Sequence, residues 1–234
     1  MQLDATTVPN KTVLDNIFWH TLTGPHAGFA TGTGGARRYA EGFPPILGFA
    51  AAEAPDFAAL APYCAPGEHF YCERWSGAAP EGWSIDAEST MFKMVWDAPA
   101  PATGTAPDAR PLGTVHTAQM LDLAGLTQPG PFGPRNLELG EYYGLFEGPR
   151  LIAMAGERCH AGTLREISGV CTHPDFQGRG LAQRLMARLI RRQMRRGETP
   201  FLHVMSGNEH ARRLYRRMGF RDYRETVVRV VSRR

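Results

Sequence analysis

The sequence predicts a mixed α/β fold, and three observations lead to that prediction. The 234-residue chain is 43% hydrophobic, which is enough to bury a substantial core. In its second half, short apolar segments of strand type alternate with segments whose apolar residues recur every three or four positions, as on an amphipathic helix. A glycine-rich turn, FQGRGLA at 176–182, stands where one such strand passes into one such helix.

The first 97 residues are predicted to form a small mixed α/β region. Segments 46–50, 69–75 and 84–96 have strand character, and 56–64 has the pattern of a short helix. The run TGTGGA at 31–36 has no strand leading into it, so we interpret it as a flexible loop rather than a phosphate site. The residues assign no function to this region.

A segment rich in alanine and proline, residues 98–112, divides the chain. It has no apolar periodicity, which is typical of a linker or a long surface loop. We therefore expect three parts, namely an N-terminal region at 1–97, the linker at 98–112 and a second domain at 113–234.

The second domain is predicted to begin with a helix at 115–127 and an irregular stretch, QPGPFGPRN. A β-hairpin that turns at 147–149 follows, and then a strand at 164–172. Beyond the glycine turn, leucines 181, 185 and 189 mark the apolar face of a helix that ends at Gly197. A strand at 200–207, a helix at 208–219 capped by Asn208, and a strand at 220–231 complete the order.

Charge is divided unevenly along the chain. From residue 150 onward there are 19 arginines and 7 acidic residues, a net charge of +12, whereas the preceding part carries −9. Such a basic body suits a polyanion, either nucleic acid or a phosphorylated small molecule. The arginine pairs recur at helical spacing without interleaved aromatic residues, so we interpret them as solvated helix faces and expect no nucleic-acid partner.

Compartment and metal content are predicted from what the sequence does not contain. No apolar run is long enough to span a bilayer, and residues 1–11 lack the basic and apolar regions of a signal peptide. Four cysteines are too few and too unevenly spaced for a disulfide framework, and none forms a zinc-type pair. We expect a soluble, cytoplasmic protein with no membrane partner and no metal.

The glycine turn is predicted to bind an anion. Unpaired N–H groups and the helix macrodipole make a helix N-terminus attractive to phosphate, and Gly178 and Gly180 allow close approach to the backbone. The two familiar nucleotide loops do not match. No Lys-Ser/Thr pair follows the glycines, and Gln183 stands where a dinucleotide fold needs its third glycine.

Two motifs resemble the GNAT superfamily of acyl-CoA-dependent N-acyltransferases. QGRGLA at 177–182 resembles the family signature Arg/Gln-x-x-Gly-x-Gly/Ala. Downstream, Asn208, Ala211, Leu214, Tyr215, Gly219 and Phe220 resemble the segment N-x-x-A-x-x-L-Y-x-x-x-G-F. The resemblance covers residues 113–232. It implies a mostly antiparallel central sheet flanked by helices, with the smaller α/β N-terminal half as a degenerate unit of the same kind.

The resemblance also implies acetyl-CoA as the acyl donor. The turn amides would hold the pyrophosphate, while the preceding strand splays from its neighbour and frees backbone groups for the pantetheine arm or the thioester carbonyl. The implied coenzyme-binding residues are Val170, Cys171, Thr172, Gln177, Gly178, Arg179, Gly180, Leu181, Ala182 and Asn208.

Two residues are implied to catalyse the reaction, in which acetyl passes to a primary amine by direct attack in a ternary complex. Tyr215, seven residues after Asn208 on the same helix face, suits a general acid toward the coenzyme sulfur. Glu166 suits the general base, because burial in a strand would raise its pKa. A salt bridge of Glu166 with Arg165 or Arg224 is the alternative, and the alternative bases are His173 and His203.

The acceptor is left open. We expect a small molecule or an amino acid, and a cation could be recognised by Glu138, Glu141, Tyr142 and Tyr143, unless these simply form an exposed acidic loop. A peptide N-terminal acetyltransferase and a non-catalytic acyl-CoA-binding protein remain alternatives. The acyl length and the oligomeric state are also undecided, with a homodimer among the options.

Overall fold

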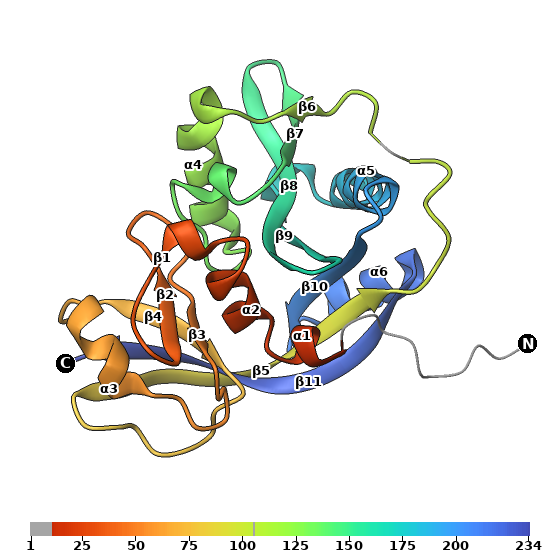
Figure 1. Ribbon diagram of the computed structural model, residues 1–234. Coiled ribbons are helices and arrows are strands. Elements are labelled where there is room, and N and C mark those ends of the chain that lie inside the picture. Colours follow the sequence, from red (N-terminus) through yellow and green to blue (C-terminus); the bar gives the residue numbers. More distant parts are fainter. Residues whose placement is uncertain (1–10, 105) are drawn as a thin grey trace, which may run out of the picture.

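The computed structural model describes residues 11–104 and 106–234 (Figure 1). Most of the N-terminal stretch behind the prediction of no signal peptide, residues 1–10, lies outside these ranges. The described α-helices are α1 (Lys11–Asp15), α2 (Ile17–Thr23), α3 (Phe57–Leu60), α4 (Thr117–Thr127), α5 (Leu181–Arg195) and α6 (Glu209–Met218). Each of them is too short or too polar to cross a lipid bilayer.

The strands form two sheets. The smaller sheet has the order β1-β2-β3, with β1 at Ala30–Thr31, β2 at Ala36–Tyr39 and β3 at Leu47–Phe49. The larger sheet has the order β4-β11-β5-β10-β9-β8-β7-β6. Its strands are β4 (His69–Glu73), β5 (Trp83–Trp96), β6 (Arg110–Pro111), β7 (Tyr142–Glu147), β8 (Arg150–Ala161), β9 (Leu164–Thr172), β10 (Thr199–Met205) and β11 (Phe220–Arg233). Only β9 and β10 pair in parallel among these described strands, so the predicted mostly antiparallel sheet is confirmed.

The large sheet contains strands from both sides of segment 98–112. β5 belongs to the first 97 residues, yet it pairs with β11 along nearly its whole length and with β10 on its other side. β4 continues the sheet beyond β11. The N-terminal region therefore supplies one edge strand and one interior strand of the sheet that carries the glycine turn.

Residues 97–104 and 106–109, which we name the strap, run along the outside of α5 (Figure 1). The guanidinium groups of α5 hold it there. Arg184 pairs with Asp108, Arg188 donates to the carbonyl of Ala106 at 3.1 Å, and Arg191 reaches the carbonyl of Ala102. The predicted linker is thus bound to the helix that follows the glycine turn.

Helices cover both faces of the large sheet. The α5 face is covered by α5 and α6 over a core that includes Ile167 and Leu189. The α2 face is covered by α1, α2 and α4, and its core includes Phe18 and Phe201. Side chains alternate along each strand, so neighbouring residues of β9 and β10 belong to opposite faces.

The predicted helices and strands are present, with ends that differ by a few residues. Sequence patterns missed α1 and α2 as well as the short strands β1 and β2. The two helices are separated at Asn16, whose side-chain amide donates to the carbonyl of Phe49 at 2.8 Å. That contact joins residues far apart in the sequence, and local periodicity does not reveal it.

Candidate active site

The glycine turn leads from β9 into α5 through a short 3-10 segment, Pro174–Phe176. Gly178 has φ +77° and Gly180 has φ +71°, a left-handed conformation that side-chain-bearing residues rarely adopt. Gly180 is the N-cap of α5 and offers no side chain to the helix amides. A Cβ at either glycine would meet nothing within 4 Å, so the backbone there faces open space.

The amides of the turn are free to bind a ligand. Within the described residues, no acceptor takes the N–H groups of 178–183, and the first bonded amide is that of Arg184, which donates to the Gly180 carbonyl. Gln177 differs from the prediction, because its amide donates to the Pro174 carbonyl inside the turn. The Arg179 guanidinium lies 4.8 Å from the centre of the Phe176 ring. The cradle therefore consists of the amides from Gly178 to Gln183.

β9 and β10 separate beside this turn. Their parallel pairing begins at Leu164 with Thr199 and ends at Glu166 with Phe201, although both strands continue. The unpaired ends run to Thr172 and Met205. The structure thus contains an opening between two central strands, just before the amide cradle.

A bulge in β9 decides which backbone groups face the opening. The register with β8 shifts around Gly169, whose φ is +61° and whose added Cβ would press on Tyr142. Beyond the bulge, Cys171 pairs with Met154, and the amide of His173 donates to β8. Because alternate residues of an antiparallel strand bond to the same neighbour, Val170 and Thr172 turn their backbone groups toward the opening.

Cys171 therefore departs from its predicted role. Its backbone faces β8, and its side chain lies buried beneath α4. Burial raises the pKa of the thiol to about 11. Cys171 is a packing residue next to the opening, while its two neighbours carry the free backbone groups.

α6 presents the second motif. Asn208 accepts a hydrogen bond from the amide of Ala211 at 3.1 Å, so its predicted role as a helix cap is confirmed. Tyr215 packs against Phe220, and burial raises the pKa of its hydroxyl to about 12. Among the described residues, nothing hydrogen-bonds that hydroxyl, and it is not one of the fully buried unpartnered atoms. It is a protonated phenol with a free donor.

Glu166 is bound on several sides. Arg158 donates to both of its carboxylate oxygens, at 3.0 and 2.6 Å, and the Cys159 amide donates at 3.1 Å. His203 Nδ1 lies 2.7 Å from Oε1. Burial alone would raise the pKa of Glu166, but Arg158 and His203 lower it well below its usual range. The expectation of a raised pKa is wrong, because a guanidinium and an imidazole stabilise the ionised form.

The partners proposed for Glu166 from the sequence are engaged elsewhere. Arg165 pairs with Glu198 and Arg224 with Asp15, so neither reaches Glu166. Arg158 was missed because it lies on the neighbouring strand β8 and has no fixed sequence distance from Glu166. Glu166 is the centre of a buried ion network, in which Arg158 and His203 stabilise its ionised carboxylate.

His203 belongs to the same network. Its Nδ1 faces Glu166, so Nδ1 carries the proton and Nε2 offers the lone pair when the ring is neutral. The imidazole packs against Phe18, with 5.3 Å between the two ring centres, and the buried Nε2 has no partner among residues 11–104 and 106–234. His203 lies on β10 beyond the last residue that pairs with β9. An imidazole with one buried, unpartnered nitrogen thus lies on the stretch of β10 that borders the opening.

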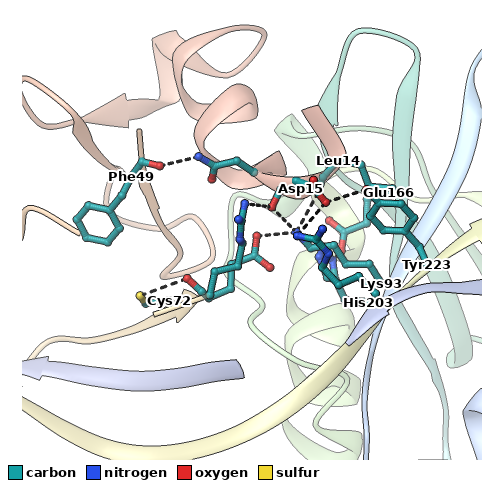
Figure 2. Close-up of polar contacts among 12 residues, drawn as sticks. Leu14, Asp15, Phe49, Cys72, Lys93, Glu166, His203 and Tyr223 are labelled. Atoms are coloured by element: carbon teal, nitrogen blue, oxygen red, sulfur yellow. Dashed lines mark hydrogen bonds and ion pairs between the residues drawn. The ribbon is translucent and has the colours of Figure 1, made fainter. Parts of the chain in front are cut away.

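A buried lysine lies next to His203 on the α2 face. Figure 2 shows both side chains below α1, near Leu14 and Asp15. Lys93 Nζ donates to Glu73 at 2.8 Å and to the carbonyls of Leu14 and Asp15 at 2.9 and 3.1 Å. All of its donors are therefore used, and Lys93 fastens α1 to the sheet.

The other predicted histidine lies apart from this network. His173 precedes the glycine turn, where its Nδ1 accepts from the Asp175 amide and its Nε2 contacts Arg150. The structure does not bring His173 together with Glu166.

The residues proposed to recognise an acceptor contact other side chains of the protein. Glu138 pairs with Arg135, and Glu141 with Arg192 and Arg196. The Tyr142 hydroxyl is buried and accepts from Asn136, while the Tyr143 ring lies under Arg188 and Arg192. In this structure these four side chains therefore hold neighbouring segments of the chain together.

A cavity of about 390 Å³ lies between α5 and α6. Gly180 and Gln183 border it at the start of α5, and Met218 at the end of α6. Trp96 and the strap complete its wall. Sequence reasoning missed this cavity because its walls come from four separate segments. Elsewhere in the described chain, no cluster of His, Cys, Asp and Glu has the arrangement of a metal site.

Comparisons with known proteins point to one kind of enzyme. A model of the FR47-like protein family matches residues 142–230. A crystal structure from Novosphingobium aromaticivorans, described as an acetyltransferase of the GNAT family, is 33% identical with a TM-score of 0.87 and covers 94% of this chain and 98% of its own. A search of curated proteins gives no significant match.

More distant structures share the fold. A GCN5-related N-acetyltransferase from Kribbella flavida has a TM-score of 0.59 at 15% identity and covers 94% of each chain. A GCN5-related N-acetyltransferase-like protein from Streptococcus suis has the same TM-score at 14% identity, covering 97% of this chain and 94% of its own. The likeness extends over both halves of the chain.

Proposed function

The chain belongs to the GNAT family of acetyltransferases, and on that premise we propose that it transfers the acetyl group of acetyl-CoA to a primary amine of a small molecule. One observation carries the proposal. The unbonded amides of 178–183 lie directly after the strand that opens away from its neighbour. An extended donor with a diphosphate would find hydrogen-bond partners along that whole path.

The chain's own groups divide the work of holding the donor. The turn amides and the N-terminus of α5 bind the diphosphate, since both favour negative charge. The backbone groups of Val170 and Thr172 pair with the amides of the pantetheine arm. An N–H in this stretch also suits the thioester oxygen as negative charge develops on it.

Two side chains are assigned to proton transfer. The amine nitrogen attacks the thioester carbon, the C–N bond forms, and the C–S bond breaks. Tyr215 gives its proton to the departing thiolate, and burial keeps this hydroxyl protonated at neutral pH. His203 Nε2 takes the proton of the amine, directly or through one water, while Glu166 fixes the ring and stabilises the imidazolium.

The N-terminal half favours a small acceptor. α1 and α2 cover the α2 face above His203, and the buried contacts of Lys93 hold α1 in place. An amine that reaches His203 must therefore enter beside this layer. A peptide N-terminus is the alternative, and it would require a wider path.

The arginines of α5 and α6 argue against a nucleic-acid interface. Most of them are paired with acidic groups of the same chain, and a paired guanidinium contributes little to phosphate binding. The ion pairs join Arg184 to Asp108, Arg192 to Glu141, Arg212 and Arg216 to Asp222, and Arg213 to Glu209.

The proposal is tested by following thiol release from acetyl-CoA across small amines, amino acids and short peptides. We expect turnover with at least one small amine, and none with the Gly180→Glu variant, whose side chain would place bulk and charge on the amide cradle. Absence of both turnover and acetyl-CoA binding would contradict the proposed function, while binding without turnover would favour the non-catalytic alternative.

The role of His203 is tested by the His203→Gln variant, which keeps a hydrogen-bond donor for Glu166. We expect kcat/KM to fall about 10²-fold while the affinity for acetyl-CoA stays unchanged, because the general base is gone. An unchanged kcat/KM, or a parallel loss of acetyl-CoA affinity, would exclude His203 as the base.

A further inference from the structure

We propose that α1 is a movable cover over His203, that Lys93 and Tyr223 latch this cover to the sheet, and that its release admits the acceptor amine. This inference rests on the proposed function and deepens it, because it names the element that controls which acceptors enter. The residues concerned lie on α1, β5 and β11, outside the glycine turn and the motif on α6.

His203 Nε2 is closed to an acceptor in the arrangement described. The atom is buried, and its imidazole packs against Phe18 of α2. Leu14 of α1 is completely buried and belongs to the same core as Phe18 and Phe201, which precedes His203 by two positions on β10. A path beside α1 and α2 therefore reaches Nε2 only when part of this layer shifts.

α1 is the part of the layer with the fewest apolar attachments. It has five residues, and its one fully buried side chain is Leu14. α2 packs against β3 and β8 and buries four side chains, those of Ile17, Phe18, Thr21 and Leu22. A short segment with little buried apolar surface opens at a lower free-energy cost than a helix that packs on two strands. We therefore assign the movement to α1.

Asn16 allows α1 to move without α2. Its backbone lies outside the helical range, with φ −127° and ψ 50°. Its side-chain amide donates to the carbonyls of Phe49 and Ala50, at 2.8 and 3.2 Å. A non-helical residue that is anchored to another segment is suited to be a hinge. α1 can turn about Asn16 while α2 stays on the sheet.

Polar contacts at the last residue of α1 form the latch (Figure 2). Lys93 and Arg74 both donate to the carbonyl of Asp15, at 3.1 and 2.9 Å. The Tyr223 hydroxyl donates to the Asp15 carboxylate at 2.7 Å, and Arg224 pairs with that carboxylate at 3.2 Å. Groups from β5, from β11 and from the end of β4 thus hold α1 by one end.

The latch lies next to the base that α1 covers. Lys93 of β5 and His203 of β10 are register partners, so their side chains stand side by side on the α2 face. Lys93 Nζ donates to Glu73 Oε1, whereas the buried Oε2 has no partner within the described residues. When α1 leaves, the ammonium group can turn to this second oxygen. Lys93 therefore keeps a partner in both arrangements, as a two-state element requires.

The first test measures access to His203 without any turnover. Diethyl pyrocarbonate modifies neutral imidazoles, and mass spectrometry of peptides gives the rate at each histidine. In the wild type, we expect His203 to react far more slowly than the exposed His69. Tyr223→Phe should speed the reaction of His203 about tenfold, and Lys93→Met about 10²-fold, because they remove one and two bonds to α1.

The matched control is Arg38→Met. It breaks another ion pair of the N-terminal half, that with Glu68, and none of the described hydrogen bonds of Arg38 reaches α1. We expect the reaction of His203 to be unchanged in this variant. Circular dichroism establishes that each variant is folded, and Tyr223→Phe keeps the test decisive if Lys93→Met does not fold.

The second test compares propylamine with the bulkier naphthylmethylamine as acceptors. Both latch variants should raise kcat/KM for the bulky amine relative to propylamine about tenfold, with the KM for acetyl-CoA unchanged. A purely structural role of Lys93 and Tyr223 would lower both rates alike.

The outcomes separate the inference from the proposed function. If His203 reacts as fast as His69 in the wild type, or no faster in the latch variants, α1 is not its cover. Faster reaction with an unchanged preference between the two amines would overturn the role of α1 in acceptor entry. If no amine is acetylated by any variant, it is the proposed function that fails.

Discussion

Charged side chains are placed differently on the two faces of the large sheet. On the α2 face, Glu166 and Lys93 are almost completely buried, and their partners come from other strands or from α1. On the α5 face, Glu157 is the one buried carboxylate described, the arginines of α5 and α6 lie toward the surface, and the polar groups nearest the opening are unbonded backbone amides. One face is closed by internal ion pairs, and the other is left open for a ligand.

This difference separates two requirements of a transferase. A group that moves a proton must be held in one orientation, which buried partners such as Glu166 provide for His203. A site for a flexible acetyl donor needs N–H groups that are fixed in place but free of hydrogen-bond partners, and a helix N-terminus meets that need. The two sites meet where β9 and β10 separate.

The largest expected effect is on stability and concerns the α2 face, which is closed by buried ion pairs. Glu166→Gln should lower the free energy of unfolding by about 3–5 kcal/mol, because it leaves the buried Arg158 without a counter-charge. The matched change Glu141→Gln, at the partly exposed pairs with Arg192 and Arg196, should cost less, about 1 kcal/mol. Urea unfolding monitored by circular dichroism measures both. Equal losses would show that burial does not set the strength of these pairs.

The second-largest expected effect is on kcat and concerns the α5 face, which is left open for a ligand. Tyr215→Phe should lower kcat by about 10²-fold and leave the affinity for acetyl-CoA unchanged, because it removes one unbonded hydroxyl and keeps the ring against Phe220. Steady-state rates and CoA titration of the same preparation provide the measurement. A parallel loss of rate and affinity would identify Tyr215 as a binding residue.

The smallest expected effect is on the pH dependence of stability, and it comes from the buried His26 and the partly buried His160. Burial, with the charges of His160 and Arg165, lowers the pKa of His26 to about 3, and His160 is lowered to about 4. In the unfolded chain histidine binds a proton below about pH 6.5, so the unfolded state binds more protons from there down. The free energy of unfolding should therefore fall by about 2 kcal/mol from His26 between pH 8 and pH 5, and further from His160.

Urea midpoints across this pH range provide the measurement, with His26→Phe as the comparison variant. That variant should show a shallower decline, because one of the two groups no longer titrates. The same slope in both proteins would place the pH dependence elsewhere in the molecule.

The sequence predicted the elements of the second half well because their patterns are local. The glycine turn, the cap at Asn208 and the apolar stripe of α5 are each defined within about one helix length. The partner of Glu166 could not be predicted, since Arg158 faces it across the β8–β9 ladder. The bulge at Gly169, which changes the direction of Cys171, was missed for the same reason. Which residues meet across strands depends on register, and register depends on the whole sheet.

The central place of β5 also bears on how the chain folds. This strand is synthesised about a hundred residues before β10 and β11, between which it comes to lie. Its edges stay unpaired until the C-terminal strands emerge, so the sheet can close only late in synthesis. The two halves, expressed as separate fragments cut within the strap, would each lack a neighbour that only the other can supply.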